Sequence, residues 1–175
     1  MPEARDRTAE IVAAARVLLD EGGPEALSMR RIADALGIRA PSLYKHVPDK
    51  GALEAALVSE AFEECALRFD RAAAEAAPGE ELAAIGAAYR AFARERPHLY
   101  RLMTGGPLDR DRLAPGSEER AAAALLRATG GDGDRARAAW AFAHGMAILE
   151  LDGRFPPDAD LGAAWQRGME AFATP

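Results

Sequence analysis

Apolar residues recur at helical spacing along almost the whole chain, and no segment alternates polar and apolar residues as a strand does. Residues 5–21 place Ile11, Ala15 and Leu18 on one stripe, and Gly22, Gly23 and Pro24 follow directly. Alanine, the strongest helix former, makes up about a quarter of the chain. Glycine and proline breaks divide the 175 residues into helices expected at about 5–21, 28–36, 40–44, 49–77, 80–95, 97–103, 117–130, 134–151 and 161–172. We therefore predict an all-α fold of about nine helices.

Four polar residues stand where helices are expected to begin. Ser28 and Asp49 are suited to accept the unpaired backbone N–H groups of a first turn, and Ser117 and Asp134 occupy similar places. We expect all four to act as N-caps.

The charge of the chain is unevenly distributed. The net charge is −6 and the pI near 5.2, which argues against a protein that coats nucleic acid through bulk positive charge. Residues 1–50 are neutral, however, and residues 28–50 carry five basic and two acidic groups. A local basic patch is therefore expected in an otherwise acidic protein.

The single cysteine, Cys65, allows neither an internal disulfide nor a cysteine-based metal site. The charged start of the chain does not resemble a signal peptide, and no apolar run approaches the ~18 residues that span a bilayer. We expect a cytoplasmic protein with no membrane partner.

Residues 28–47 read as two short helices joined by a glycine turn. Gly37 ends the first, and Pro41 fits the first turn of the second, where a missing N–H costs nothing. Small residues at the leading end of the second helix would let it enter the major groove of DNA, which is ~12 Å wide. This arrangement is a helix-turn-helix whose second helix would read base edges.

The same stretch resembles the DNA-binding domain of the TetR family of transcriptional regulators. The signature residues are Ser28, Arg30, Ile32, Ala33, Gly37, Ile38, Leu43, Tyr44, His46, Val47 and Lys50. The resemblance implies a three-helix DNA-binding domain over residues 5–65, a double-stranded operator as partner, and a homodimer that a small molecule releases from DNA.

The resemblance also implies a role for each matching position. Phosphate or sugar contacts fall to Ser28, Arg30, Tyr44, His46 and Lys50. Contacts with base edges are implied for Arg39, Ala40, Pro41, Ser42 and Lys45. For Arg39, contact with a phosphate is the alternative.

Residues 80–175 resemble the C-terminal domain of some TetR-like proteins that is named WHG, here after Trp140, His144 and Gly145. The resemblance implies a regulatory and dimerisation domain with a ligand pocket. A pocket lined by aromatic and polarisable side chains with few polar groups would suit an unknown apolar or aromatic small molecule. The candidates are Phe62, Cys65, Tyr89, Phe92, Tyr100, Met103, Trp140 and His144. Whether Trp140 and His144 line the pocket or belong to the core stays open.

The last two helices carry the expected dimer surface. Leu161, Trp165, Met169 and Phe172 recur at steps of four, four and three, the stripe that a two-fold four-helix seam would use. Phe142 and Met146 add a second apolar face to the preceding helix. Packing of the last stripe on its own subunit is the alternative.

Enzyme motifs are missing from the sequence. Glu95 and His98 have the spacing of a di-iron motif, but Pro97 interrupts it, and the three histidines form no zinc pair. We therefore expect no enzyme, metal or cofactor. Three hypotheses remain: a ligand-released dimeric repressor, a TetR-like DNA-binding protein without a small-molecule inducer, and a helical ligand-binding or enzymatic protein that retains the helix-turn-helix.

Overall fold

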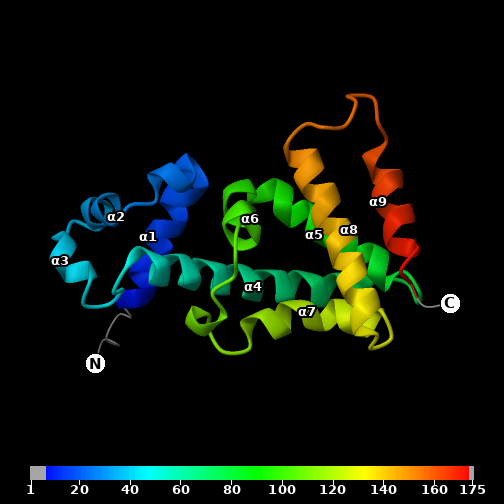
Figure 1. Ribbon diagram of the computed structural model, residues 1–175, viewed down its shortest axis with the longest axis horizontal. Coiled ribbons are helices and arrows are strands. Elements are labelled where there is room, and N and C mark those ends of the chain that lie inside the picture. Colours follow the sequence, from blue (N-terminus) through cyan, green and yellow to red (C-terminus); the bar gives the residue numbers. More distant parts are fainter. Residues whose placement is uncertain (1–6, 174–175) are drawn as a thin grey trace. The chain divides into compact units, whose positions relative to one another are not determined.

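The structure, a computed structural model, describes residues 7–173, and all regular elements within that range are helical (Figure 1). The α-helices are α1 (Arg7–Gly22), α2 (Met29–Ala35), α3 (Ala40–Leu43), α4 (Lys50–Glu75), α5 (Glu81–Glu95), α6 (Pro97–Thr104), α7 (Ser117–Ala128), α8 (Gly133–Leu151) and α9 (Leu161–Glu170). Two single 3₁₀ turns, η1 (Pro24–Ala26) and η2 (Arg110–Arg112), lie in loops. The predicted all-α class is confirmed.

The described chain divides into two compact units. The first contains residues up to 61 together with 98–115, and the second contains residues 62–97 together with 116–173. Helix α4 contributes residues to both. The expected functional domains, residues 5–65 and 80–175, have different boundaries from these two units, and their assignment stays a prediction. Their residues 5–6 and 174–175 lie outside the described range.

The first unit buries the apolar faces that the sequence pattern placed on its helices. α1 contacts α2, and α2 contacts α3. Its fully or nearly fully buried side chains are Ile11, Val12, Leu19, Ile32, Leu43, Val47, Leu53, Leu57, Leu99 and Tyr100. Such burial of aliphatic side chains is the main source of stability in a unit of this size.

The second unit is built differently, because alanine and glycine form many of its helix contacts. The buried residues of α8 are Ala136, Ala139, Ala143 and Ala147. Gly86 of α5 faces Met169 of α9 so closely that an added Cβ would lie 2.5 Å from the Met169 Cγ. Small residues here let neighbouring helices approach closely.

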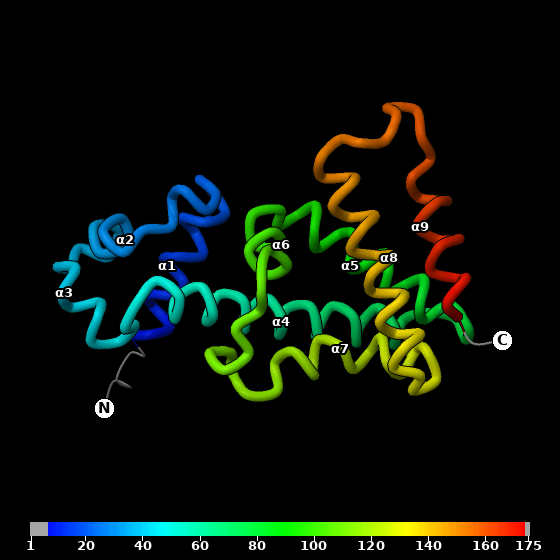
Figure 2. The backbone as a smooth tube through the Cα atoms, viewed as in Figure 1, coloured from blue at the N-terminus to red at the C-terminus, as the bar shows by residue number. Residues whose placement is uncertain are grey.

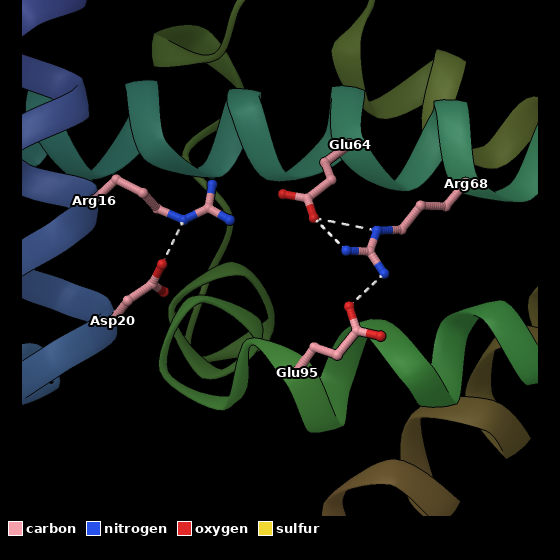
Figure 3. Close-up of polar contacts among 5 residues, drawn as sticks. All are labelled: Arg16, Asp20, Glu64, Arg68 and Glu95. Atoms are coloured by element: carbon pink, nitrogen blue, oxygen red, sulfur yellow. Dashed lines mark hydrogen bonds and ion pairs between the residues drawn. The ribbon is translucent and has the colours of Figure 1, made fainter.

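Ion pairs connect α4 to α5 and α7 within the second unit. Arg68 of α4 donates to Glu64 at 3.1 Å and to Glu95 of α5 at 2.8 Å, so its guanidinium joins two helices (Figure 3). Arg120 and Arg127 of α7 pair with Glu63 and Asp70 of α4. These contacts fix α4 between its two neighbours.

Two of the four expected helix caps are confirmed. The Ser28 Oγ accepts the Arg31 N–H at 3.3 Å, and the Asp49 Oδ1 accepts the Ala52 N–H at 2.7 Å.

The other two expected caps are wrong. The N-cap of α7 is Gly116, in the left-handed region at φ 76°, so Ser117 already lies inside the helix. α8 is capped by Asp132 rather than Asp134, because the Asp132 carboxylate accepts the N–H groups of residues 134 and 135.

No helix in the described part of the chain is long and apolar enough to cross a bilayer.

Candidate nucleic-acid interface

The turn between α2 and α3 is a glycine-dependent helix end. The Ile38 N–H donates to the Ala33 carbonyl at 3.0 Å, which closes the last turn of α2 in a Schellman motif. Gly37 takes the left-handed φ of 64° that this motif needs. A Cβ at Gly37 would meet nothing within 4 Å, so the backbone angle, not space, selects glycine.

Helix α3 is short and is held by two apolar side chains. Leu43 and Val47 are buried, whereas Tyr44, between them, is 50% exposed. The N–H groups of His46 and Val47 both donate to the Leu43 carbonyl at 2.9 Å, which extends the helical path past the end of α3. One side of the segment is therefore anchored in the core while the other faces solvent.

The predicted DNA-contacting residues lie on this solvent side and beside it. Ala40 and Ser28 are half-buried, and the others are exposed: Arg30, Arg39, Pro41, Ser42, Tyr44, Lys45, His46 and Lys50. Arg30 is 4.0 Å from Asp34 and Lys50 is 3.3 Å from Glu54, both loose surface pairs that leave the cations available.

The beginning of α4 completes the surface. Asp49 caps the helix and Lys50 is its first residue, so a cation stands at the positive end of a 26-residue helix. Helix N-termini of this kind bind phosphate groups. An exposed short helix with small leading residues, flanked by cations, is suited to a DNA groove and its phosphate edges.

Comparison with known proteins decides the family. Residues 82–172 match the model of the tetracyclin repressor-like C-terminal domain, and residues 11–57 match that of the bacterial regulatory proteins of the tetR family. An uncharacterized HTH-type transcriptional regulator of Mycobacterium tuberculosis, Rv0681, is 31% identical over 151 residues, which cover 82% of this chain and 69% of that protein. The chain belongs to the TetR family of transcriptional regulators.

Solved structures agree with the fold. A protein of unknown function from Rhodococcus sp. RHA1 has a TM-score of 0.75 at 26% identity, covering 94% of this chain and 92% of that one. A TetR variant of Acinetobacter baumannii AYE in complex with minocycline has a TM-score of 0.61 at 22% identity, covering 93% and 91%.

The predicted ligand-binding residues of this TetR family member fall in both units. Tyr100 and Met103 belong to the first unit; Phe62, Cys65, Tyr89, Phe92, Trp140 and His144 belong to the second. In the second unit, Cys65, Tyr89 and Phe92 are buried, and the ring of Tyr89 stacks on Phe69 with centroids 6.0 Å apart. These three side chains are therefore enclosed by the protein.

Trp140 and His144 lie apart from that core, on α8. Trp140 is 50% exposed, and its ring stacks on that of His144 with centroids 6.0 Å apart. Partial burial lowers the pKa of His144. The sequence left open whether these residues line a pocket or belong to the core. The structure instead buries the alanine face of α8 and leaves Trp140 half in solvent.

Some of the predicted dimer residues are buried by contacts within their own chain. Trp165 and Met169 are buried in their own second unit, on the side of α9 that packs against α5 and α8. Phe142 lies 6.2 Å from Trp165 and 6.1 Å from Phe172, centroid to centroid, while Met146 and Leu161 are half-buried. Trp165 and Met169 are thus buried by contacts within their own chain, the alternative stated for this stripe, and a role for them at the dimer surface stays a prediction.

Sequence reasoning missed a polar network that involves Trp165. The Glu150 carboxylate on α8 accepts two hydrogen bonds from Arg90 at 2.8 Å and one from the Trp165 indole N–H at 3.1 Å. Burial opposes its ionisation, but these donors outweigh burial and lower the pKa of Glu150. Residues 60 positions apart meet here, and no local pattern signals such a contact.

Two shallow hollows lie on the second unit. One, of about 370 Å³, is lined by residues of α4 and α5, among them Leu67 and Arg68; the other, of about 640 Å³, is lined by alanines and by charged and polar residues such as Arg94 and Gln166. None of the predicted ligand residues lines either hollow.

Metal and thiol chemistry find little support. Among residues 7–173, no three His, Cys, Asp or Glu side chains gather as a metal site. Burial raises the pKa of the Cys65 thiol to about 12, so it is protonated at neutral pH and a poor nucleophile.

Proposed function

We propose that this TetR family member is a dimeric repressor that binds a palindromic operator and leaves it when a small molecule binds the second unit. The observation that carries the proposal is α3 with the turn that follows it, where Leu43 and Val47 are buried while Tyr44 and its polar neighbours face solvent. A helix anchored on one side and polar on the other is what entry into a major groove requires.

In this proposal the leading residues of α3 approach base edges. Ala40, Pro41 and Ser42 are short enough to allow close approach, and Arg39 and Lys45 can donate to guanine. Arg30, Tyr44, His46 and Lys50 bind phosphate or sugar and set the register, with the Ser28 hydroxyl available to join them while it caps α2.

The outer face of α8 is the surface that best suits a second copy. Ala141 and Leu149 are exposed one turn to either side of Gly145 on this helix, and a Cβ at Gly145 would meet nothing within 4 Å. An exposed apolar strip that contains a glycine lets a symmetry-related helix approach closely, as a two-fold dimer interface needs. Phe142, Met146, Leu161 and Phe172 would border that seam.

The ligand proposal rests on the chemistry of the second unit. Minocycline, the ligand in the Acinetobacter structure, is bound by that protein; for this chain we propose an apolar or aromatic molecule. Since Cys65, Tyr89 and Phe92 are buried, a ligand could reach them only after neighbouring side chains move. Such a ligand would favour a different conformation from the one that binds DNA.

DNA selection tests the first part of the proposal. Purified protein should retain a small set of palindromic fragments from a genomic library at moderate salt, and Tyr44→Ala with Lys50→Ala should weaken binding at least about 100-fold, since each lost phosphate contact adds to the effect. Glu75→Ala with Arg154→Ala is the matched control, since both are exposed residues of the second unit. Retention of no fragment would sink the proposal.

Ligand linkage tests the second part. A molecule that weakens operator binding by about 100-fold must itself bind about 100-fold more weakly to the operator complex. Unequal factors would exclude the mechanism, and failure of every ligand to release DNA would favour a TetR family protein without an inducer.

The dimer is tested on α8. Leu149→Glu should give monomers on a sizing column, because a carboxylate would be buried at the seam. Trp165→Glu is not an equivalent test, because it would place a second carboxylate beside Glu150 inside the subunit. A Leu149→Glu protein that elutes as an unchanged dimer would place the seam elsewhere.

A further inference from the structure

The loop after α6 belongs structurally to the DNA-binding unit. Residues 98–115 cluster with residues up to 61, although they lie inside the stretch that matches the C-terminal domain model. Figure 2 follows the chain from α6 into this loop, residues 105–116, which contains the short turn η2. The loop therefore brings groups from the middle of the sequence to the unit that carries α3.

Two hydrogen bonds attach the loop to the first part of α4. The Arg112 Nη1 donates to the Asp49 Oδ1 at 2.7 Å, and the Ala114 N–H donates to the Ser59 Oγ at 2.9 Å. The Ser59 hydroxyl in turn donates to the Ala55 carbonyl at 2.8 Å. Ten residues of helix separate the two attachment points, about 15 Å along the axis.

The Arg112 contact is made at the N-cap of α4. Asp49 already accepts the Ala52 N–H, and this bond, followed by that from Arg112, lowers the pKa of the Asp49 carboxyl. Arg112 is oriented from the other side by Asp109, 3.2 Å from its Nε. Its guanidinium thus bridges a loop carboxylate and the helix cap.

Space at the cap is matched to the guanidinium. A Cβ at Gly51 would lie 3.1 Å from the Arg112 Nη1 and 3.2 Å from the Asp49 Oδ1. Because Gly51 has no side chain, Arg112 can lie over the first turn of α4, next to Lys50.

We propose that Arg112 is a positioning residue for operator binding, acting through Asp49 on the first turn of α4. This inference rests on the proposed DNA-binding function. Only six residues separate Leu43, the last residue of α3, from Lys50, so the placement of the α4 cap constrains both the recognition helix and the Lys50 ammonium. The same ion pair offsets the negative charge of the Asp49 carboxylate, which lies next to Lys50 and the phosphate contact proposed there.

The experiment uses the full-length protein and the operator selected above, with affinity measured by fluorescence anisotropy. Arg112→Ala should weaken operator binding about three- to tenfold, the range of effects transmitted through one contact. Arg110→Ala is the matched control, because it removes the same charge from the same turn and leaves the Arg112–Asp49 contact in place. It should cost less than about twofold, since it leaves the contact at the α4 cap unchanged.

A double-mutant cycle separates positioning from direct phosphate binding. Asp49→Asn keeps a capping side chain but removes the charge partner. In that background Arg112→Ala should cost no more than Arg110→Ala, and Arg112→Lys in the native background should recover part of the affinity, because an ammonium can still pair with Asp49.

Salt dependence and folding complete the test. The slope of log affinity against log salt should be the same for Arg112→Ala and Arg110→Ala, whereas a directly bound phosphate would lower the slope by about one for Arg112→Ala alone. Circular dichroism and elution volume verify that each variant is folded. Equal losses for Arg112→Ala in both backgrounds, or a loss equal to that of Arg110→Ala, would overturn the inference. Wild-type protein that binds no DNA would instead refute the proposed function.

Discussion

The two units of this protein use apolar side chains in opposite ways. In the first, large aliphatic residues such as Leu43 and Ile32 form the core, and the polar residues between them are free to face a partner. In the second, alanines form much of the helix contacts, and the large aromatic Trp140 is left half in solvent. On α8, therefore, side-chain size fails to predict burial, although large side chains such as Phe92 and Met169 are buried elsewhere in the second unit.

Removing the partly buried Glu150 carboxylate of the second unit should have the largest effect on stability. Glu150→Ala leaves Arg90 and the Trp165 indole N–H without their acceptor, which should cost about 3 kcal/mol in free energy of unfolding. Chemical denaturation followed by tryptophan fluorescence measures this. Asp158→Ala, an exposed loop carboxylate, should cost nearly nothing. A small loss for Glu150→Ala would show that alanine packing alone stabilises the second unit.

Two glycines of the second unit should respond in opposite directions. A Cβ at Gly168 would lie 1.9 Å from the Phe142 ring, so Gly168→Ala should destabilise the subunit by about 1–3 kcal/mol through overpacking. Gly145 faces open space, so Gly145→Ala should stabilise the isolated subunit by about 0.5–1 kcal/mol through helix propensity.

The same pair also sharpens the dimer proposal. If the α8 face is the seam, Gly145→Ala should weaken dimerisation in sedimentation equilibrium while it raises the stability of the subunit. Unchanged dimerisation would place the close approach of the two helices away from Gly145.

Loss of a helix cap probes the first unit. Ser28→Ala removes the acceptor of the Arg31 N–H and should lower the free energy of unfolding by about 1 kcal/mol. Ser28→Asn should retain most of the stability because asparagine also caps. Ser117→Ala should have no capping effect, since Ser117 lies inside α7. A capping loss at Ser117 would contradict this assignment.

The smallest expected effect depends on pH. Burial lowers the pKa of His144 below its ordinary value of 6.5, so the folded protein binds fewer protons there than the unfolded chain. This contribution to stability is present above about pH 6.5 and is lost as the pH falls through the lowered pKa. Thermal unfolding from pH 7.5 to 5 should show a shallower decline for His144→Gln than for wild type. Identical declines would mean that His144 is not the responsible group.

The fold of the first unit and the exposure of its candidate DNA-contacting residues could be predicted because their signals are local. Ser28, Gly37 and Pro41 each fix a helix end through backbone geometry that depends on their immediate neighbours. The positions of Leu43 and Tyr44 then follow from helical spacing. No distant contact is needed to place these residues.

The second unit could not be predicted to the same depth, because the choice of a buried face there depends on distant partners. α8 is apolar on several faces, and its alanine face is buried because small residues admit the neighbouring helices. Trp165 fits a seam by spacing, but the indole N–H finds Glu150 inside the subunit. The Arg112–Asp49 pair spans 63 residues and has no local signature at all.

The placement of the tryptophans gives this protein a built-in optical probe. Both tryptophans, Trp140 and Trp165, lie in the second unit, where one is half in solvent and the other is enclosed beside a carboxylate. Intrinsic emission excited at the red edge of the absorption band therefore comes from the second unit alone, with a long-wavelength component from Trp140 and a short-wavelength one from Trp165. This emission can follow the binding of a small molecule, the formation of a dimer and the unfolding of this unit without a label. The DNA-binding unit contains no tryptophan and does not contribute to the signal.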